Sequence, residues 1–178
     1  MPTCYMLIGL PGSGKSTISE GLLKDMPDLI IVSTDEYIEK YARERGKKYE
    51  EVYREAGEDA QKWMNVRIRQ IINEKKNFAW DQTNVFKSAR KKKISMLEQN
   101  KYDVVAVALH LSEEELEKRL TNRVAKGGKK ISYKIIQDMK ASYELPSYEE
   151  RFKEVYLIGD TGAFHLVDKP SVIKIGKN

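Results

Sequence analysis

The chain has 178 residues, a length that suits one domain with a substantial hydrophobic core. Charged residues make up 33% and hydrophobic residues 40%, which is ordinary for a soluble globular protein. The net charge of +5 favours anionic partners only mildly and is not the footprint of a dedicated nucleic-acid binder. A single cysteine, Cys4, excludes an intrachain disulfide. No signal-peptide pattern and no apolar run of about 18 residues is present, so we expect a cytoplasmic protein without membrane contact.

Five apolar runs predict β-strands, and the segments between them predict helices. The predicted strands are residues 3–8, 29–32, 78–80, 102–109 and 152–158. The predicted helices are residues 18–26, 36–75 with breaks at Gly46 and Gly57, 87–99, 112–123 and 132–143. This alternation predicts a single α/β domain over residues 1–178, with a parallel five-stranded sheet flanked by helices. Two tail segments, 164–167 and 172–173, are compatible with short edge strands.

The segment that follows the first strand fits the phosphate-binding pattern G-x-x-x-x-G-K-[ST] and leads into a helix. Its glycines let backbone N–H groups point at phosphate oxygens, and the helix N-terminus adds partial positive charge. Lys15 is expected to reach the β- and γ-phosphates, and the Ser16 hydroxyl to ligate Mg²⁺. The predicted nucleotide-binding residues here are Gly9, Pro11, Gly12, Ser13, Gly14, Lys15, Ser16 and Thr17. The motif predicts a P-loop NTPase fold that binds ATP and Mg²⁺.

Asp35 follows the second strand, where parallel strands end and ligands bind. A carboxylate at this position can accept the proton of an attacking hydroxyl during phosphoryl transfer. The alternative is that Thr34 or Asp35 is the N-cap of the following helix. The P-loop beside it favours the base.

Asp81-Gln82-Thr83-Asn84 ends the third strand. Polar side chains at a strand end hold Mg²⁺-bound water or position a substrate, so Asp81, Thr83 and Asn84 are predicted substrate-binding residues. An Asx-type turn before the next helix is a competing interpretation, and both can hold.

Ser112 and Glu115 form a capping-box pattern that starts a helix carrying Arg119 and Arg123 on one face. Lysines 126, 129 and 130 follow around the pair Gly127-Gly128. Glycines beside clustered cations are typical of a mobile lid, so we predict a helical lid at about residues 119–133. We expect this lid to close over ATP, with Arg119 as an ATP-binding residue, and to bring guanidinium groups, among them that of Arg123, to the transferring phosphoryl. The alternative is a solvated basic face paired with nearby glutamates.

A basic run consists of Lys87 and residues 90–93. It is compatible with a nucleic-acid backbone contact or with an ordinary solvated helix face. The two histidines, His110 and His165, stand apart in the sequence and are interpreted as structural or surface residues.

Taken together, these segments resemble the polynucleotide 5′-hydroxyl kinase family of P-loop kinases, of the T-even phage type. The resemblance covers residues 3–158. It is carried by the segments GLPGSGKST, TDEYI, DQTN, EEELEKRLTNR and MKASYELPSYEERFKEVYLI. It implies that Lys15 and Ser16 bind phosphate and Mg²⁺, that Asp35 is the general base, and that Arg123 is the lid arginine. By the same resemblance Asp81, Thr83 and Asn84 match the polar turn after the third strand.

Two positions depart from the family pattern. The arginine that grips the substrate's phosphate, three residues after the base, is replaced by Ile38, and Gln82 separates Asp81 from Thr-Asn. Because only a short tail follows residue 158, we expect no phosphatase domain like the one in the phage-type family. We therefore predict an ATP- and Mg²⁺-dependent kinase whose acceptor is the 5′-OH of a nucleic acid. The alternatives are a small-molecule kinase, which Ile38 favours, and a nucleotide-gated binding or toxin-like module. DNA or RNA preference, strand state and oligomeric state stay open.

Overall fold

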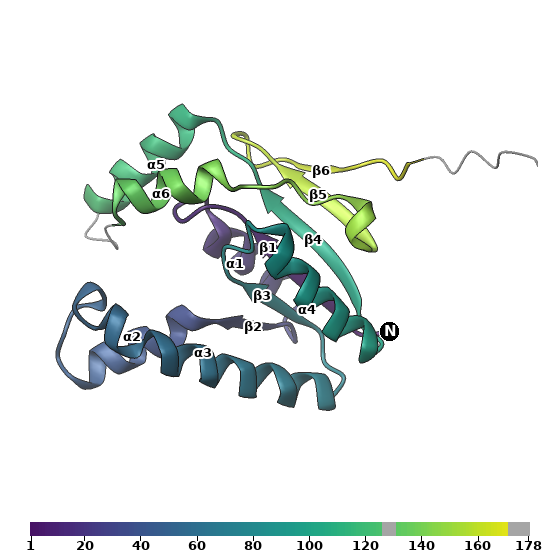
Figure 1. Cartoon of the computed structure of the whole chain (residues 1–178), viewed down its shortest axis with the longest axis horizontal. Helices are drawn as coiled ribbons and strands as arrows, with labels where there is room; N and C mark the ends of the chain where they lie inside the picture. The colour runs from purple at the N-terminus through teal and green to yellow at the C-terminus, as the bar shows by residue number, and fades with distance from the viewer. Residues whose placement is uncertain (126–130, 171–178) are drawn as a thin grey trace, which may run out of the picture.

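A six-stranded mixed sheet forms the centre of the computed structural model, which describes residues 1–125 and 131–170 (Figure 1). The strand order is β2-β3-β1-β4-β5-β6, with parallel pairing from β2 to β5 and antiparallel pairing of β6 with β5. The strands are β1 (Thr3–Ile8), β2 (Ile30–Ser33), β3 (Phe78–Asp81), β4 (Asp103–Leu109), β5 (Glu154–Ile158) and β6 (Phe164–Leu166). This order, with β1 between β3 and β4, places the P-loop near the middle of the sheet.

Six α-helices in the described residues flank the sheet. They are α1 (Lys15–Asp25), α2 (Thr34–Glu44), α3 (Tyr49–Asn73), α4 (Lys87–Gln99), α5 (Glu113–Ala125) and α6 (Tyr133–Ala141), and a 3₁₀ turn, η1 (Tyr148–Glu150), precedes β5. In Figure 1, α2 and α3 lie at the β2 side of the sheet, and α5 and α6 lie on the other side of β1. The described part of the chain has no helix that is both long and apolar enough to span a bilayer.

The prediction of five parallel strands was wrong, because the tail adds a sixth, antiparallel strand. Residues Phe164–Leu166 pair with β5, as one alternative for the tail anticipated, while 172–173 lie outside the described residues. Gly46 does break the long helical region, but Gly57 lies inside α3. Of the predicted lid, the basic and glycine residues 126–130 also lie outside the described residues.

The two faces of the sheet bury alternate residues of its strands. On one face Cys4, Met6 and Ile8 of β1 pack with side chains of α3 and α4, among them Ile68 and Ile94. On the other face Leu7 and neighbouring β4 residues pack with Ile18 and Leu22 of α1. This alternation fits strands buried on both faces, as expected for a parallel sheet covered by helices.

The carboxyl ends of three adjacent strands are in register. Asp81 pairs with Ser33 of β2 on one side and with Leu7 of β1 on the other. The segments that begin at Gly9 and Asp35 therefore leave the sheet beside Asp81. The fold gathers the three predicted functional segments at one edge, as the order of strands and helices predicted.

Candidate active site at the carboxyl edge of the sheet

The P-loop is a tight backbone turn that only glycine accommodates at two positions. Gly12 and Gly14 have φ angles of +81° and +104°, in the left-handed region that side chains disfavour. The Ser13 N–H donates to the Leu10 carbonyl at 3.1 Å, and the Gly9 N–H donates to the Thr83 carbonyl at 2.9 Å. The Ser13 hydroxyl is buried and has no hydrogen-bond partner in the described structure. An orphaned buried hydroxyl inside a glycine turn at a helix N-terminus fits a loop that takes up phosphate oxygens.

Lys15 opens α1 and turns its ammonium back into the loop. Its Nζ donates to the carbonyls of Gly9 and Leu10, both at 3.0 Å. Burial lowers the pKa of Lys15 to about 8; the Asp81 and Asp35 carboxylates oppose that shift, whereas the Arg123 guanidinium adds to it. Lys15 therefore lies within electrostatic reach of Asp35, Asp81 and Arg123, which come from α2, β3 and α5.

Oxygen donors for a magnesium ion lie on the first turns of α1 and at the end of β3. Ser16 and Thr17 are exposed, and the Ser19 hydroxyl lies 3.1 Å from the Lys15 carbonyl and 3.4 Å from Asp81 Oδ2. Within residues 1–125 and 131–170 no three His, Cys, Asp or Glu side chains are grouped as a metal site. A hydroxyl and a carboxylate with few other protein ligands fit Mg²⁺, which keeps several waters and binds through substrate phosphates.

Asp35 is not the N-cap of α2, so the alternative interpretation of this residue was wrong. Ser33 caps the helix, and its hydroxyl accepts the Asp35 N–H at 3.2 Å. The Asp35 carboxylate instead accepts a hydrogen bond of 2.5 Å from the Tyr49 hydroxyl, at the start of α3. Burial, followed by this hydrogen bond to Asp35, raises the pKa of Tyr49 well above its usual range, which keeps Tyr49 a donor. Tyr49 thus fixes the orientation of the carboxylate.

Helix α5 packs directly on the P-loop. Arg119 Nη1 donates to the Ser13 carbonyl at 2.8 Å, while its Nε bonds Glu115 and its Nη2 donates to the Asp160 carbonyl at 3.3 Å. A side chain at Gly14 would meet Arg119 Nη1 at 3.0 Å, and one at Gly12 would meet Leu120 at 2.6 Å. The two glycines thus allow α5 to approach the loop, and Arg119 braces its outer side.

The turn after β3 is held together by its own polar side chains. Asn84, with φ of +48°, is buried and donates through Nδ2 to the carbonyls of Leu7, Trp80 and Gln82 at 2.7, 3.4 and 3.3 Å. Thr83 contributes the carbonyl that accepts the Gly9 N–H. Both residues therefore join β1, β3 and the P-loop, and their contact with a substrate stays a prediction.

The basic run divides into inward-facing and exposed residues. Arg90 is fully buried and forms two 2.8 Å bonds with Glu150, and its Nη1 donates to the carbonyls of Asn84, Val85 and Glu144. Lys93 donates to Gln82 Oε1 at 2.7 Å and to Asn84 Oδ1, and its Nζ lies 4.4 Å from the centre of the Trp80 ring. Lys87, Lys91 and Lys92 are exposed. Of the basic residues in this run, only these three lysines are exposed and available to a nucleic-acid backbone.

Lys93 makes stability depend on pH. Burial lowers the pKa of Lys93 to about 8 in the folded protein, whereas an unfolded lysine keeps its proton to about pH 10.4. Between these pH values the unfolded chain binds more protons than the folded protein. The free energy of unfolding therefore increases as the pH rises. We expect the wild type to gain about 1–2 kcal/mol relative to Lys93→Met between pH 7.5 and 9.5, measured by urea unfolding. A constant difference between the two proteins across this range would contradict the buried ammonium.

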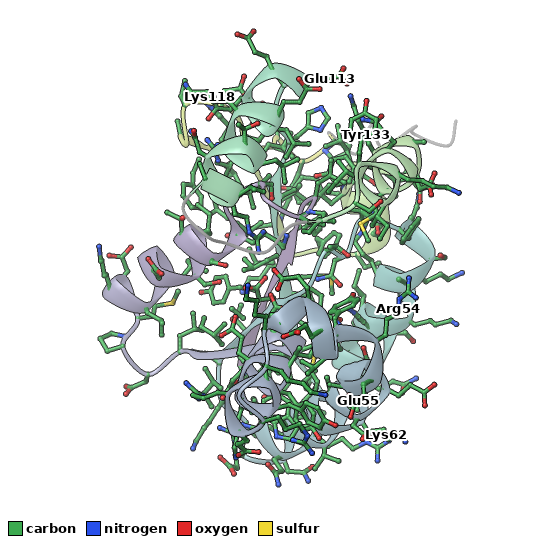
Figure 2. All side chains as sticks on the ribbon, turned by 90° about the vertical axis from the view of Figure 1, so that its left-hand side faces the viewer. Arg54, Glu55, Lys62, Glu113, Lys118 and Tyr133 are labelled. Carbon is green, nitrogen blue, oxygen red and sulfur yellow. The ribbon has the colours of Figure 1, made fainter. Side chains whose placement is uncertain are left out.

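The position of the missing substrate-phosphate arginine holds a buried apolar side chain. Ile38 is 1% exposed and packs with Ala42, Val52, Ala56 and Ala60 between α2 and α3. In Figure 2, residues of α3 (Arg54, Glu55 and Lys62) lie at one end of the view and residues of α5 and α6 (Glu113, Lys118 and Tyr133) at the other. The pair α2 and α3 thus lies on the opposite side of the molecule from the pair α5 and α6.

Two residues of the site were missed by the sequence interpretation. Tyr49 lies 14 residues after Asp35, and no local pattern links the two. Arg90 carried a signal, because it shares the 3–4 spacing of the buried Ile94 and Leu97 on α4, where a charge requires a buried partner.

Comparison with known proteins gives matches over most of the chain. A family model described as an AAA domain matches residues 5–146. Heterogeneous nuclear ribonucleoprotein U-like protein 2 is 27% identical over 155 residues in both Mus musculus and Homo sapiens. The match covers 84% of this chain and 20% of the relative, so the chain spans about a fifth of the length of these curated relatives.

Solved structures with this fold include kinases of different substrates. A fungal RNA kinase has a TM-score of 0.56 and 15% identity, covering 97% of this chain and 79% of the other. A sugar kinase from Janibacter sp. HTCC2649 has a TM-score of 0.55 and 18% identity, with coverage of 90% and 87%. A structure of the PezAT toxin–antitoxin system of Streptococcus pneumoniae has a TM-score of 0.63 and 17% identity, with coverage of 92% and 69%.

These likenesses establish a P-loop kinase-like α/β fold and leave the substrate undetermined. Because the family model covers well over half of the 178 residues, the chain belongs to the AAA domain family AAA_33.

Proposed function

We propose that the chain is an ATP- and Mg²⁺-dependent kinase whose acceptor is the 5′-OH of a polynucleotide. The observation that carries this proposal is the Asp35 carboxylate, which accepts a 2.5 Å hydrogen bond from the Tyr49 hydroxyl at the edge of the sheet where β3 ends at Asp81 and the P-loop with Lys15 begins. A P-loop that only held nucleotide would not need a carboxylate held by a tyrosine opposite its lysine. The combination of a phosphate-binding lysine, a held carboxylate and a second cation is what phosphoryl transfer requires.

Each residue has a distinct role in the proposed reaction. Asp35, oriented by Tyr49, takes the proton of the acceptor hydroxyl while the oxygen of that hydroxyl attacks the γ-phosphorus of ATP. The bond between the γ-phosphorus and the bridging oxygen breaks, and this oxygen leaves with ADP. Lys15 stabilises the charge that builds on the phosphates, and Arg123 approaches the transferring group from α5. Mg²⁺ bound near Ser16 supplies further neutralisation of phosphate charge. Arg119 holds the loop around the nucleotide.

The polynucleotide acceptor is the second part of this proposal. The sequence segments of the polynucleotide 5′-hydroxyl kinase type support it, and so do relatives whose names include RNA kinase and ribonucleoprotein. A small-molecule kinase is the second candidate, because Ile38 is buried between α2 and α3 and leaves the substrate-phosphate position without a cation.

The test is transfer of label from γ-³²P-ATP with Mg²⁺ to a panel of acceptors. The panel contains 5′-OH DNA and RNA oligonucleotides, nucleosides, sugars and other small alcohols, with Asp35→Asn protein to exclude a contaminating kinase. We expect label on oligonucleotides. Label on small molecules alone would overturn the polynucleotide acceptor, and ATP binding without transfer to any acceptor would favour a binding or toxin-like module.

Gly12 allows a direct test of the nucleotide-binding loop. Gly12→Ala places a Cβ 2.6 Å from Leu120 Cδ2 at a φ of +81°, so both the loop and its contact with α5 are distorted. We expect ATP affinity to fall by about tenfold or more, measured by calorimetry. Gly46→Ala is the matched control, since φ is +61° there and a Cβ would meet nothing within 4 Å. Equal ATP affinities in the Gly12→Ala variant and the wild type would contradict this geometry.

A further inference from the structure

One stripe of α3 changes from buried to exposed along its length. Residues at three- and four-residue spacing share this face; they are Tyr53, Gly57, Ala60, Met64, Ile68 and Ile71. Met64, Ile68 and Ile71 are buried against the sheet, whereas the Tyr53 side chain is 54% exposed. The apolar stripe therefore continues past the part of the helix that the sheet covers.

The stripe becomes exposed because α3 extends beyond the carboxyl edge of the sheet. Strand β3 ends at Asp81, and the next residue, Gln82, donates through Nε2 to Gln61 Oε1 of α3 at 3.3 Å. Gln61 thus marks the level of the sheet edge on the helix. Tyr53 lies eight residues earlier, or about 12 Å further along the helix axis. Tyr53 and Gly57 therefore lie on the sheet-facing side of α3, beyond the sheet edge at which β2 and β3 end.

Tyr53 is linked to Asp35 through one neighbouring ring. The ring centroids of Tyr49 and Tyr53 are 5.6 Å apart, and the Tyr49 hydroxyl donates to Asp35 Oδ1 at 2.5 Å. The Tyr49 side chain thus connects the exposed Tyr53 ring to the Asp35 carboxylate, the proposed acceptor of the hydroxyl proton.

Gly57 leaves open space one helical turn from Tyr53. A Cβ at Gly57 would have no atom within 4 Å, so no contact in the folded chain requires glycine there. Glycine inside a helix lowers helix stability relative to alanine. The absence of a side chain here gives a flat group access to the face of α3 beside the Tyr53 ring.

We propose that Tyr53 and Gly57 form a stacking shelf for the base of the 5′-terminal nucleoside of the acceptor. A flat base stacks on an exposed ring, while its sugar carries the 5′-OH to Asp35. A sugar or an aliphatic alcohol has no flat face to use such a shelf. This inference rests on the proposed polynucleotide kinase function and adds the part of the acceptor that α3 recognises.

The first test compares two 5′-OH oligonucleotides that differ only at the 5′-terminal residue, one with its base and one abasic. We expect the wild type to show a KM roughly tenfold lower for the oligonucleotide with the base. Tyr53→Ala should remove this preference, and Tyr53→Phe should keep it, since the ring and not the hydroxyl stacks. Phe164→Ala, at a 50% exposed ring on the distant strand β6, should keep the preference too.

The second test fills the open space. Gly57→Leu should raise the KM for the base-bearing oligonucleotide about tenfold and leave the KM for the abasic one unchanged. Because leucine favours helix more than glycine does, the variant should remain folded, which thermal melting checks. Gly21→Leu is the matched control, since Gly21 is also a helical glycine with open space around it.

The outcomes separate this inference from the function on which it rests. Equal wild-type KM values for the two oligonucleotides would overturn the shelf and leave the kinase proposal standing. A preference that survives Tyr53→Ala would also overturn it. If the wild type phosphorylates no oligonucleotide at all, both the shelf and the polynucleotide acceptor are wrong.

Discussion

Replacing Asp35 by asparagine is expected to lower the rate of phosphoryl transfer by about 10³-fold while ATP affinity stays unchanged. Asparagine keeps the size of the side chain and its acceptor oxygen for the Tyr49 hydroxyl, but it cannot take a proton from an attacking hydroxyl. In the proposed reaction ATP contacts the P-loop, whereas Asp35, in the first turn of α2, faces the acceptor. The expected loss therefore appears in kcat, which single-turnover kinetics with labelled ATP measures.

The neighbouring acid provides the control for this experiment. Glu36 is exposed on the same turn of α2, so Glu36→Gln removes a carboxylate beside the site without touching the reaction. We expect this variant to retain wild-type kcat. If Asp35→Asn retained turnover within a few-fold of the wild type, Asp35 would not be the general base.

Replacing Arg90 by methionine is expected to lower the free energy of unfolding by about 3–5 kcal/mol. The guanidinium is fully buried, and its loss leaves the Glu150 carboxylate without its two 2.8 Å partners in a buried position. Three carbonyls, of Asn84, Val85 and Glu144, lose a donor at the same time. Urea unfolding followed by circular dichroism measures this change.

A second substitution separates the unpaired charge from the loss of packing. In Arg90→Met/Glu150→Leu no buried charge is left without a partner, so this protein should be more stable than the single variant. Lys91→Met, at an exposed position of the same helix, should change stability by less than about 0.5 kcal/mol. A single variant as stable as Lys91→Met would show that the ion pair contributes nothing.

The position of the site could be predicted because it follows from strand order. The apolar runs before Gly9, Asp35 and Asp81 identify strands, and parallel strands end at one edge. The pairing of Asp81 with Leu7 and Ser33 confirms that these segments meet. The glycines of the motif predicted a tightly curled backbone, and Gly12 and Gly14 do have left-handed φ angles.

The remaining features depend on contacts between distant segments. Strand β6 is three exposed residues long and is defined by pairing with β5, so its own sequence carries little signal. Helix α3 passes through Gly57 because the apolar positions on both sides continue in phase, which outweighs the cost of one glycine. The contact between Tyr49 and Asp35 spans two helices and has no local pattern.

The central claim is transfer of a phosphoryl group from ATP to a polynucleotide 5′-OH, and one reaction tests it most directly. The wild type is incubated with γ-³²P-ATP, Mg²⁺ and an oligonucleotide that ends in a 5′-OH or, in parallel, in a 5′-phosphate. We predict that label enters the 5′-OH oligonucleotide alone, because only that end offers a hydroxyl for Asp35 to deprotonate. Absence of label from the 5′-OH oligonucleotide, with ATP bound and the protein folded, would contradict it.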